Sequence, residues 1–548
     1  MPEVLHGTDH RPLEPGKTLF DYADEVSVAV PQSCGRSGRC RECVVEVRRG
    51  GDSLSARTPA ETYLPQAFRL ACQAEIVALD QDVEFAIIRR QMRILEDAGE
   101  APTDIDPLVT VDAYAVHYDG MPIDKLRGRA LGLAIDVGTT TVAFRLLDLT
   151  DGSIVAAGAL ENPQRFGGSD VMTRISYERT HRGVMRKALR RALNAALRET
   201  YSRLGIDRHE VYEAMVVANS TMRDLFFDLD ISPIGEMPYK SITELAVING
   251  EAEDTWLSKR AYQLGLFMHP QGRVIGAPLI ASHVGGDVSA DLIATDFMHQ
   301  PGVSMLVDIG TNTELVVSDG TRILAASCPA GPAFEGGLLR HGMPGAEGAI
   351  ESVRIADGRF DYSVIGDVEP EGICGSGLVD ILAELRRMDW MSQEGRFADA
   401  RDDYTVAAER NITFSRSDAS ELAQAKAANA CGQVILLRQL GVAPQGIDRA
   451  FLAGGFANAV DVENAIAIGF LAPVPAANVH RVGNAALRGA AMLLMSRGKR
   501  AELDMLISRI EHVELETEPD FFELFVDGCQ FMPFMAPTGA TSEAVLAG

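Results

Sequence analysis

The hydrophobic pattern of the chain consists largely of short apolar runs that end in turns rich in glycine and threonine. Residues 131–135 form one such run, and residues 305–307 form another. Short apolar runs bounded by turn residues predict buried β-strands. By contrast, residues 183–204 repeat Arg, Ala and Leu with the period of an amphipathic helix. The pattern therefore predicts an α/β protein in which strands lead into polar loops.

The run at residues 131–135 and the turn after it are repeated later in the chain. The first copy, from residue 134, reads AIDVGTTTVAFRLLDLTDGSIVAAG, and the second, from residue 305, reads MLVDIGTNTELVVSDGTRILAAS. Each has Asp-aliphatic-Gly-Thr-x-Thr, an aliphatic strand, an Asp-Gly turn and a strand ending in Ala-Ala. Two unrelated hairpins with Asp-Gly turns are the alternative, but the match continues beyond the loop. The repeat therefore predicts two similar lobes that face each other across a cleft.

The turn in each copy has the residue types that bind phosphate and Mg²⁺. Gly138 and Gly310 let backbone N–H groups approach an anion closely, and the hydroxyl groups beside them are further donors. Asp136 and Asp308, at the strand ends, can hold Mg²⁺ directly or through water. The phosphate-binding candidates are Gly138, Thr139, Thr140, Gly310, Thr311 and Asn312.

A third segment, residues 450–456, is a short apolar strand that ends in Gly454, Gly455 and Phe456. Such a turn lets a flat base lie against the backbone. In their residues and their order, the three motifs resemble the phosphate-1, phosphate-2 and adenosine motifs of the acetate/sugar kinase, Hsp70 and actin (ASKHA) superfamily. The resemblance implies a duplicated, two-lobed α/β ATPase that binds ATP with Mg²⁺. Lobe I would cover residues 131–300 and lobe II residues 301–535.

Lobe II carries further candidates whose sequence signal is less specific. Glu335 can position the attacking water, although an ordinary loop carboxylate explains it equally well. Gly331 lies in the same glycine-rich loop. Gly375, Ser376 and Gly377 open a predicted helix, whose N-terminus can meet phosphate or ribose.

Four of the eight cysteines lie near the N-terminus, at Cys34, Cys40, Cys43 and Cys72. Their spacing is C-x5-C-x2-C-x28-C. Plant-type [2Fe–2S] ferredoxins use C-x4-C-x2-C with a distant fourth cysteine, and the segment RLACQ around Cys72 also resembles them. The resemblance implies an α+β, β-grasp ferredoxin domain over residues 1–80, with the four thiolates as ligands of a [2Fe–2S] cluster.

A zinc site built from the same four cysteines is the alternative. Zinc sites usually have two C-x2-C pairs, and this segment has one. Arg36, Arg39 and Arg41 lie in the same loop. They are either solvated surface charge or a docking site for a partner, and the sequence favours neither.

Residues 81–130 are predicted to link the ferredoxin domain to lobe I. Residues 82–98 read as the end of a strand followed by a helix. Residues 99–107 are rich in proline and acidic residues. Such a link suits a cluster domain that swings between a donor and an acceptor, but it also suits a plain domain boundary. Residues 536–548 are small and polar, which predicts a disordered tail.

Composition and charge limit the class of protein. Apolar residues make up 46% and charged residues 23% of the 548 residues, which is ordinary for a globular protein. No uninterrupted apolar run reaches the roughly 18 residues of a membrane span, and the first residues lack the basic and apolar regions of a secretion signal. The net charge of −26 argues against nucleic acid, because phosphate would be repelled. We therefore expect a cytoplasmic protein with no nucleic-acid or membrane partner.

The combination of a ferredoxin segment with ASKHA motifs, together with NPQRFGGSDV, GPAFEGG, ICGSGLVD and LAGGFAN, resembles the reductive activators of corrinoid enzymes. The resemblance implies ATP-driven, one-electron reduction of a Co(II) corrinoid to Co(I). The partners would be a corrinoid protein or corrinoid-dependent methyltransferase and an electron donor, either a flavoprotein or a ferredoxin. The segment between the ferredoxin domain and Asp136 is short for members with an extra small domain there, which leaves the route of cluster movement open.

Three alternatives share part of this pattern. A small-molecule kinase with a fused redox domain has the same nucleotide motifs. An activator of a 2-hydroxyacyl-CoA dehydratase would hold a [4Fe–4S] cluster between two subunits, with Cys328 and Cys374 as ligands, but such activators lack a ferredoxin domain. Buried thiols explain these two cysteines more simply. An Hsp70-like chaperone would need a peptide-binding β-domain after lobe II.

Overall fold

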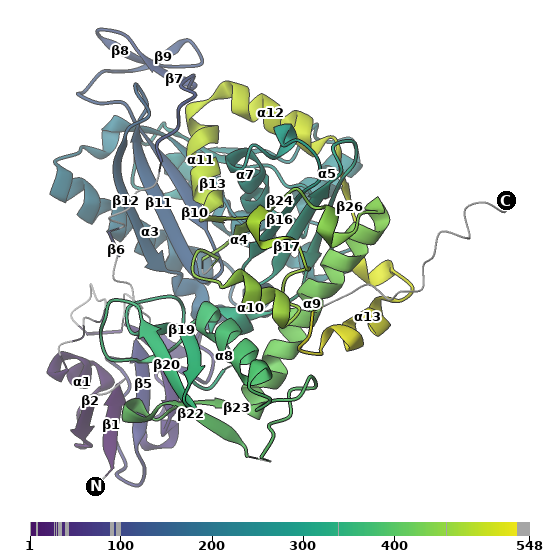
Figure 1. Cartoon of the computed structure of the whole chain (residues 1–548). Helices are drawn as coiled ribbons and strands as arrows, with labels where there is room; N and C mark the ends of the chain where they lie inside the picture. Colours follow the sequence, from purple (N-terminus) through teal and green to yellow (C-terminus); the bar gives the residue numbers. More distant parts are fainter. Residues whose placement is uncertain are drawn as a thin grey trace, which may run out of the picture. The chain divides into compact units, whose positions relative to one another are not determined.

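The computed structural model describes residues 2–6, 9–26, 28, 30, 36–38, 43–87, 93–94, 100–337, 339–399, 401–455 and 457–533. The chain forms two compact units (Figure 1). Unit 1 comprises Met1–Ser282 and Ala490–Arg497, and unit 2 comprises His283–Gly489 and Gly498–Gly548. Each unit contains one copy of the repeat.

The N-terminal part of unit 1 is a five-stranded mixed sheet with one helix. The sheet order is β2-β1-β5-β3-β4, and only the β1–β5 pair is parallel. Helix α1 begins after a capping box between Thr18 and Asp21, and it buries Leu19 and Phe20. The elements are β1 (Glu3–His6), β2 (Asp9–Pro12), α1 (Leu19–Glu25), β3 (Val44–Arg49), β4 (Phe68–Leu70) and β5 (Val83–Ile87).

The segment predicted to be a linker contains strands. Strand β6 (Arg93–Ile94) pairs with β12 of lobe I. The rest of the helix predicted here, at residues 88–92 and 95–99, lies outside the described residues. A separate three-stranded sheet follows, made of β7 (Val109–Val111), β8 (Ala115–Tyr118) and β9 (Met121–Lys125). Its second hairpin turns at Asp119 and Gly120, both with positive φ, which is the geometry of a tight turn.

The proline-rich segment before that sheet is bonded to the rest of unit 1. The backbone N–H of Asp106 donates to the carbonyl of Met495 at 2.8 Å. The Arg497 guanidinium pairs with the Asp106 carboxylate at 2.8 Å, and the Ser496 hydroxyl donates to Asp104 at 2.6 Å. These contacts fix the segment that the sequence offered as a swinging link.

The part of lobe I that lies in unit 1, up to Ser282, is built on a seven-stranded sheet of order β14-β15-β13-β10-β11-β12-β6, whereas residues 283–300 belong to unit 2. Helix α3 packs on β12 (Figure 1). Its strands are β10 (Leu131–Val137), β11 (Thr141–Asp148), β12 (Ile154–Glu161), β13 (Val211–Val217), β14 (Leu257–Arg260) and β15 (Arg273–Gly276). Its helices are α2 (Val171–Thr180), α3 (Val184–Leu204), α4 (Ser220–Phe226), α5 (Ile242–Ile248) and α6 (Ala261–Leu264).

Lobe II, in unit 2, is built on a six-stranded sheet of order β25-β24-β16-β17-β18-β26, against which α9 packs. Its strands are β16 (Ser304–Ile309), β17 (Thr313–Ser318), β18 (Ile323–Cys328), β24 (Arg449–Ala453), β25 (Val479–Gly483) and β26 (Ile510–His512). Two small sheets comprise β19 (Ala349–Ala356), β20 (Arg359–Val364) and β21 (Gly372–Ile373), and β22 (Asp403–Ala407) and β23 (Ile412–Ser415).

The helices of the second half of the chain complete the architecture. They are α7 (Gly286–Ala294), α8 (Gly375–Arg387), α9 (Arg416–Leu440), α10 (Val462–Ala467), α11 (Ala485–Met495), α12 (Arg497–Ile507) and α13 (Phe521–Gly528). None of the helices in the described part of the chain has the length and apolar character needed to span a bilayer. The tail predicted at residues 536–548 lies outside the described residues.

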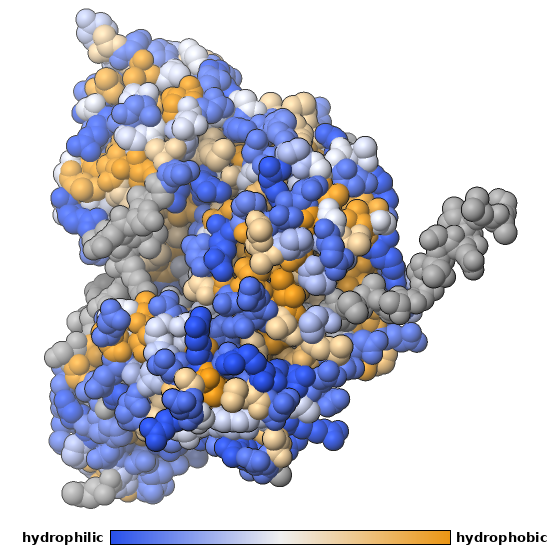
Figure 2. Space-filling model, viewed as in Figure 1, coloured by the Kyte–Doolittle hydropathy of each residue, from blue (hydrophilic) through white to orange (hydrophobic). Residues whose placement is uncertain are grey.

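The two lobes have matching sheets. Strands β15-β13-β10-β11-β12 of lobe I correspond to β25-β24-β16-β17-β18 of lobe II, with two parallel pairs followed by two antiparallel pairs in each. The internal repeat is therefore structural, and the alternative of two unrelated hairpins is excluded. The face seen in Figure 2 is mostly hydrophilic, in keeping with 77 acidic and 51 basic residues.

Candidate nucleotide and cluster sites

The predicted phosphate-1 loop connects β10 to β11 in unit 1, and polar side chains hold its carbonyl groups. Asn162 Nδ2 donates to the carbonyl of Gly138 at 2.8 Å. Arg174 Nη2 donates to the carbonyl of Thr139 at 2.7 Å. Asn219 Nδ2 donates to the Thr139 hydroxyl at 3.0 Å. Asp136, the predicted Mg²⁺ residue, is in β10 just before this loop.

These bonds fix the direction of two peptide groups of the loop. In a trans peptide the C=O and N–H groups point to opposite sides. Because Asn162 and Arg174 hold the carbonyls of Gly138 and Thr139, the N–H groups of Thr139 and Thr140 face the other way, where a phosphate can accept them. Arg174 is only 1% exposed, so its positive charge lies beneath the loop in a poorly screened environment.

The predicted phosphate-2 loop connects β16 to β17 in unit 2. The Gly310 N–H donates to the carbonyl of Asn312 at 2.9 Å, which closes the turn. The Thr311 hydroxyl donates to the Glu335 carboxylate. This contact brings the candidate water-positioning residue to the loop that directly follows β16, the strand of Asp308.

Two acidic residues, Asp287 and Asp308, act electrostatically on a third, Glu314, in unit 2. Glu314 is the direct partner of Asp308 across the β16–β17 pair, a position in which like charges repel at close range. Burial raises the pKa of Glu314 well above its usual value, and the charges of Asp287 and Asp308 raise it further. Burial also raises the pKa of Asp287, in the first turn of α7, to about 6. Carboxylate oxygen is the ligand type that Mg²⁺ prefers, and the binding of Mg²⁺ by Asp308 stays a prediction.

The adenosine motif follows β24, which is parallel to β16. The Gly454 N–H donates to the carbonyl of Gly483 at 3.1 Å. A Cβ at Gly455 would meet no atom within 4 Å, so this glycine faces open space. Phe456 lies outside the described residues.

Two residues at the start of α8, Ser376 and Gly377, have a packing role. The Ser376 hydroxyl donates to the carbonyl of Glu351 at 2.7 Å. A Cβ at Gly377 would lie 2.5 Å from the carbonyl oxygen of Ile350. Gly377 therefore lets α8 approach β19 closely, and the contact of Gly375, Ser376 and Gly377 with phosphate or ribose stays a prediction. A contact of Gly331 with the nucleotide also stays a prediction. Its φ of 76° is one that favours glycine.

The two described cluster cysteines are adjacent. Cys43 and Cys72 are 1% and 8% exposed, and their Sγ atoms are 3.4 Å apart. Two thiolates on one tetrahedral metal, with metal–sulfur bonds of about 2.3 Å, stand about 3.8 Å apart. The pair therefore fits a metal centre, and this distance alone does not separate iron from zinc. Cys34 and Cys40 lie outside the described residues.

A buried ion pair anchors the segment that carries Cys72. Arg69 Nε lies 2.7 Å from Glu61, and the Leu70 N–H donates to the same carboxylate at 3.0 Å. Burial alone would raise the pKa of Glu61, but hydrogen bonds from Arg69, Leu70 and Thr58 outweigh it and lower that pKa. The charged pair is thus satisfied inside the ferredoxin domain.

Arg36 is tied to its own domain. Its guanidinium pairs with Asp21 at 2.9 Å and with Asp24, and it lies 4.1 Å from the ring centre of Phe20. Since its charge is matched by α1, the structure favours a structural role over partner docking. Arg39 and Arg41 lie outside the described residues.

Comparisons with known proteins assign three consecutive parts of the chain. Residues 6–77 match the 2Fe-2S iron-sulfur cluster binding domain. Residues 131–300 match the RACo middle region, and residues 302–538 match the C-terminal ASKHA domain of RACo. The chain belongs to the RACo family.

Relatives of this RACo chain match it over most of its length. The corrinoid activation enzyme RamQ of Eubacterium limosum is 27% identical, covering 94% of this chain and 96% of RamQ. A reductase of the Co(II) methylated amine-specific corrinoid protein from Methanosarcina barkeri is 23% identical, covering 72% of this chain and 76% of the relative. The solved structure of a reductive activator for corrinoid, iron-sulfur protein has a TM-score of 0.70 and 26% identity, covering 97% and 98% of the two chains.

These matches confirm the predicted fold and two of the predicted cofactors. The RACo chain has an N-terminal [2Fe–2S] ferredoxin domain followed by ASKHA-type ATPase lobes, so the cluster and ATP are its cofactors. With a ferredoxin domain present, zinc becomes unnecessary to explain the N-terminal cysteines.

The cysteines of lobe II are buried among packed atoms. Cys328 and Cys374 are both buried, and burial raises the pKa of each thiol. A Cβ at Gly432 would lie 2.3 Å from Cys328 Sγ, so α9 packs directly on this sulfur. The thiol of Cys374 contacts the Ile350 carbonyl at 3.4 Å. Both behave as small core residues, which removes the basis for a second cluster in lobe II.

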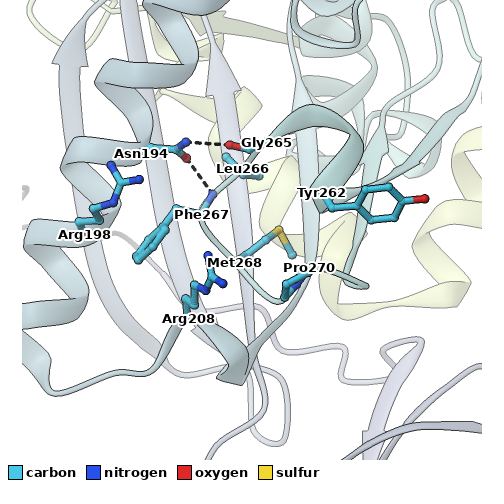
Figure 3. Close-up of a pocket in the computed structure, with 9 residues that line it drawn as sticks. All are labelled: Asn194, Arg198, Arg208, Tyr262, Gly265, Leu266, Phe267, Met268 and Pro270. Atoms are coloured by element: carbon cyan, nitrogen blue, oxygen red, sulfur yellow. Dashed lines mark hydrogen bonds between the residues drawn. The ribbon is translucent and has the colours of Figure 1, made fainter.

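A cavity in unit 1 lies apart from the nucleotide motifs. Its volume is about 180 Å³, and it lies beside Phe267, whose ring is flanked by Arg198 and Arg208 at 4.5 and 5.5 Å (Figure 3). The Asn194 side chain stabilises the wall of the cavity, because it donates a hydrogen bond to the Gly265 carbonyl and accepts one from the Phe267 N–H. None of the residues that line it belongs to a predicted site.

Proposed function

We propose that this protein is an ATP-dependent reductive activator of a corrinoid protein. It hydrolyses ATP to ADP and phosphate and passes one electron to a Co(II) corrinoid, which becomes Co(I). The observation that carries the proposal is the presence, in one chain, of a ferredoxin domain and an ASKHA domain whose central sheet is repeated in the preceding lobe. The proteins named above as a corrinoid activation enzyme and a corrinoid protein reductase support the choice of acceptor.

The energetics explain why ATP is needed. A plant-type [2Fe–2S] cluster supplies an electron near about −400 mV. Because about 59 mV is a tenfold change for one electron, a gap of roughly 120 mV to Co(I) costs nearly 3 kcal/mol. ATP can offset this cost if its binding or hydrolysis changes the protein's affinity for the corrinoid partner, since a ligand shifts an equilibrium only through differential affinity.

The roles we assign follow from the residues. Asp136 and Asp308 orient Mg²⁺ or the attacking water. Glu335, held by the Thr311 hydroxyl, positions the attacking water. The phosphate and adenosine ligands are Gly138, Thr139, Thr140, Gly310, Thr311, Asn312, Gly454, Gly455 and Phe456. The cluster ligands are Cys34, Cys40, Cys43 and Cys72.

We also propose the partners and the compartment. The acceptor is a corrinoid protein or a corrinoid-dependent methyltransferase, and the donor is a flavoprotein or another ferredoxin. The described cysteines are not joined in disulfides, which supports a reducing compartment such as the cytoplasm. The negative charge supports the expectation that nucleic acid is not a partner.

The test is to mix the reduced protein with Co(II) corrinoid proteins and to follow the Co(I) absorption with ATP, with ADP and with no nucleotide. We expect Co(I) to accumulate only with ATP. Equal yields in all three mixtures would contradict the proposal. Transfer of labelled phosphate to an added sugar or acid, without Co(I), would favour the kinase alternative.

A further inference from the structure

Within unit 1, aromatic side chains join the ferredoxin domain to lobe I. Tyr63 of the ferredoxin domain meets Phe166 of lobe I edge to face, with ring centres 6.0 Å apart. Phe166 meets Tyr177 of α2 in the same way at 5.7 Å. The Tyr177 hydroxyl donates to the Tyr63 carbonyl. All three rings are buried, so this contact is a packed interface.

An ion pair lies beside the aromatic contact. Arg165 Nη2 is 3.0 Å from Glu46, and Arg165 Nη1 is 3.2 Å from Glu161 of lobe I. Glu46 is in β3, which begins directly after Cys43. Tyr63 follows Glu61, which anchors the segment of Cys72. Lobe I therefore contacts the two parts of the ferredoxin domain that support its described cluster ligands.

The lobe I side of this interface is the segment Asn162–Gly168, and the same segment supports the phosphate-1 loop. Asn162 bonds the Gly138 carbonyl, and its own N–H donates to the Thr140 carbonyl at 2.7 Å. Arg174 links the end of the segment to the phosphate-1 loop, because it donates to the carbonyls of Gly168 at 3.0 Å and Thr139 at 2.7 Å. A continuous set of hydrogen bonds and packed rings thus runs from the phosphate-1 loop to Tyr63.

We propose that the segment Asn162–Gly168 couples occupancy of the phosphate-1 loop to the docking of the ferredoxin domain. Asn162 and Arg174 are positioning residues on the nucleotide side, and Phe166 and Tyr177 transmit the effect to Tyr63. The proposal rests on the ATP site of the proposed function, but it does not require that the electron acceptor be a corrinoid.

The direction of the effect follows from hydrogen-bond polarisation. A phosphate that accepts the N–H groups of Thr139 and Thr140 makes the carbonyl ends of the same peptides stronger acceptors. Their bonds from Asn162 and Arg174 then strengthen, which holds the segment with Phe166 more firmly. ATP therefore tightens the contact between lobe I and the ferredoxin domain.

The alternative is that these rings are ordinary domain packing with no response to nucleotide. Intermediate position in space does not by itself demonstrate coupling. The two cases differ in one measurable quantity, the change in ferredoxin-domain stability when nucleotide binds.

The experiment is hydrogen–deuterium exchange on the full, cluster-loaded chain, with and without Mg²⁺ and a non-hydrolysable ATP analogue. We expect the analogue to slow exchange of residues 44–49 and 61–70 by about threefold to tenfold, which is the shift that one ordinary hydrogen bond gives. In Tyr177→Phe and in Phe166→Leu, this response should fall to less than half while the dissociation constant of the analogue changes little.

The matched control is Tyr201→Phe, which removes the hydroxyl of another buried lobe I tyrosine that stacks on Phe267. It should keep the full response. A charge exchange offers an independent variant: Arg165→Glu should weaken the response, and adding Glu46→Arg should restore it.

Two outcomes would overturn the proposal. If the analogue binds normally but exchange of the ferredoxin domain does not change, the coupling is absent while the ATP site stands. If Phe166→Leu and Tyr177→Phe both keep the full response, the coupling does not pass through this segment. Failure of the analogue to bind at all would overturn this proposal and the proposed function together.

Discussion

Gly454 lies directly against the carbonyl group of Ile309, so that a Cβ at position 454 would be 2.1 Å from the carbonyl oxygen. Gly454 also has a φ of 109°, which side chains rarely allow. Ile309 ends β16, immediately before Gly310 of the phosphate-2 loop. The adenosine motif and the phosphate-2 motif, 144 residues apart in the sequence (454 − 310), are therefore in contact within unit 2.

The first prediction concerns this contact. Gly454→Ala must displace the backbone of Ile309, and it should weaken ATP binding by at least about 10-fold, the effect of a strain above about 1.4 kcal/mol. The control is Gly358→Ala in the β19–β20 turn, which also has positive φ but meets no atom within 4 Å. Titration calorimetry with an ATP analogue measures both variants. Equal affinity in the two would show that the contact does not shape the nucleotide site.

The second prediction concerns Asp308. Asp308→Ala removes the carboxylate that we assign to Mg²⁺ or the attacking water, and it should lower the rate of ATP hydrolysis by about 100-fold or more. Asp319→Asn, in the β17–β18 turn of the same lobe, where the carboxylate only accepts hydrogen bonds from its own turn, is the control and should keep the wild-type rate. Unchanged turnover in Asp308→Ala would remove the phosphate-2 assignment.

The third prediction separates the two groups of cysteines. Cys72→Ala should abolish the visible absorption of the cluster and the ATP-dependent formation of Co(I), while ATP hydrolysis by the lobes persists. Cys328→Ala should keep the iron content and the absorption, because Cys328 is a packed core residue. Loss of iron in Cys328→Ala would instead favour a cluster held by lobe II.

The fourth prediction is a pH dependence of stability. Lys426 of α9 is fully buried, donates to the Gln530 carbonyl at 2.6 Å, and burial lowers its pKa to about 8 from 10.5. Between these two values the unfolded chain binds one more proton than the folded chain, so stability rises with pH. The stability of the wild type relative to Lys426→Met should rise by about 2 kcal/mol from about pH 7.5 to pH 9.5.

Denaturant unfolding of both proteins across that range measures the difference. If the stability difference does not change with pH, the pKa of Lys426 is not lowered in the folded chain. A difference that falls with pH would mean that the buried amine is stabilised as a cation.

The local repeat explains why so much of the fold could be predicted. Asp136 and Asp308 sit at the ends of strands whose patterns are the same, and hairpins between neighbouring strands follow from local sequence. The two-residue strand β6 and the sheet at residues 109–125 were missed because their strands are short and weakly apolar. The Asp119–Gly120 turn was the available signal for that sheet.

The supporting residues of the site could not be predicted in the same way. Arg174 meets the Thr139 carbonyl across 35 positions of sequence, and Asn162 meets Gly138 across 24. Glu314 becomes a neighbour of Asp308 only through the antiparallel register. Such contacts depend on tertiary packing, for which a single sequence has no periodic signal. The motif NPQRFGG indicated the segment at residues 162–168, but it did not show which side chains would contact that segment.

Strand β6 sets a limit on how far the iron–sulfur domain can travel. From Ile87, the end of β5, to Arg93, the start of β6, the chain advances six residues (93 − 87). A connection of this length spans no more than about 20 Å. While β6 stays paired with Gly158 and Ala159 of β12, movement of the chain after β6 does not let the ferredoxin domain move further. An electron acceptor therefore has to approach the ferredoxin domain, unless the β6–β12 pairing is first broken.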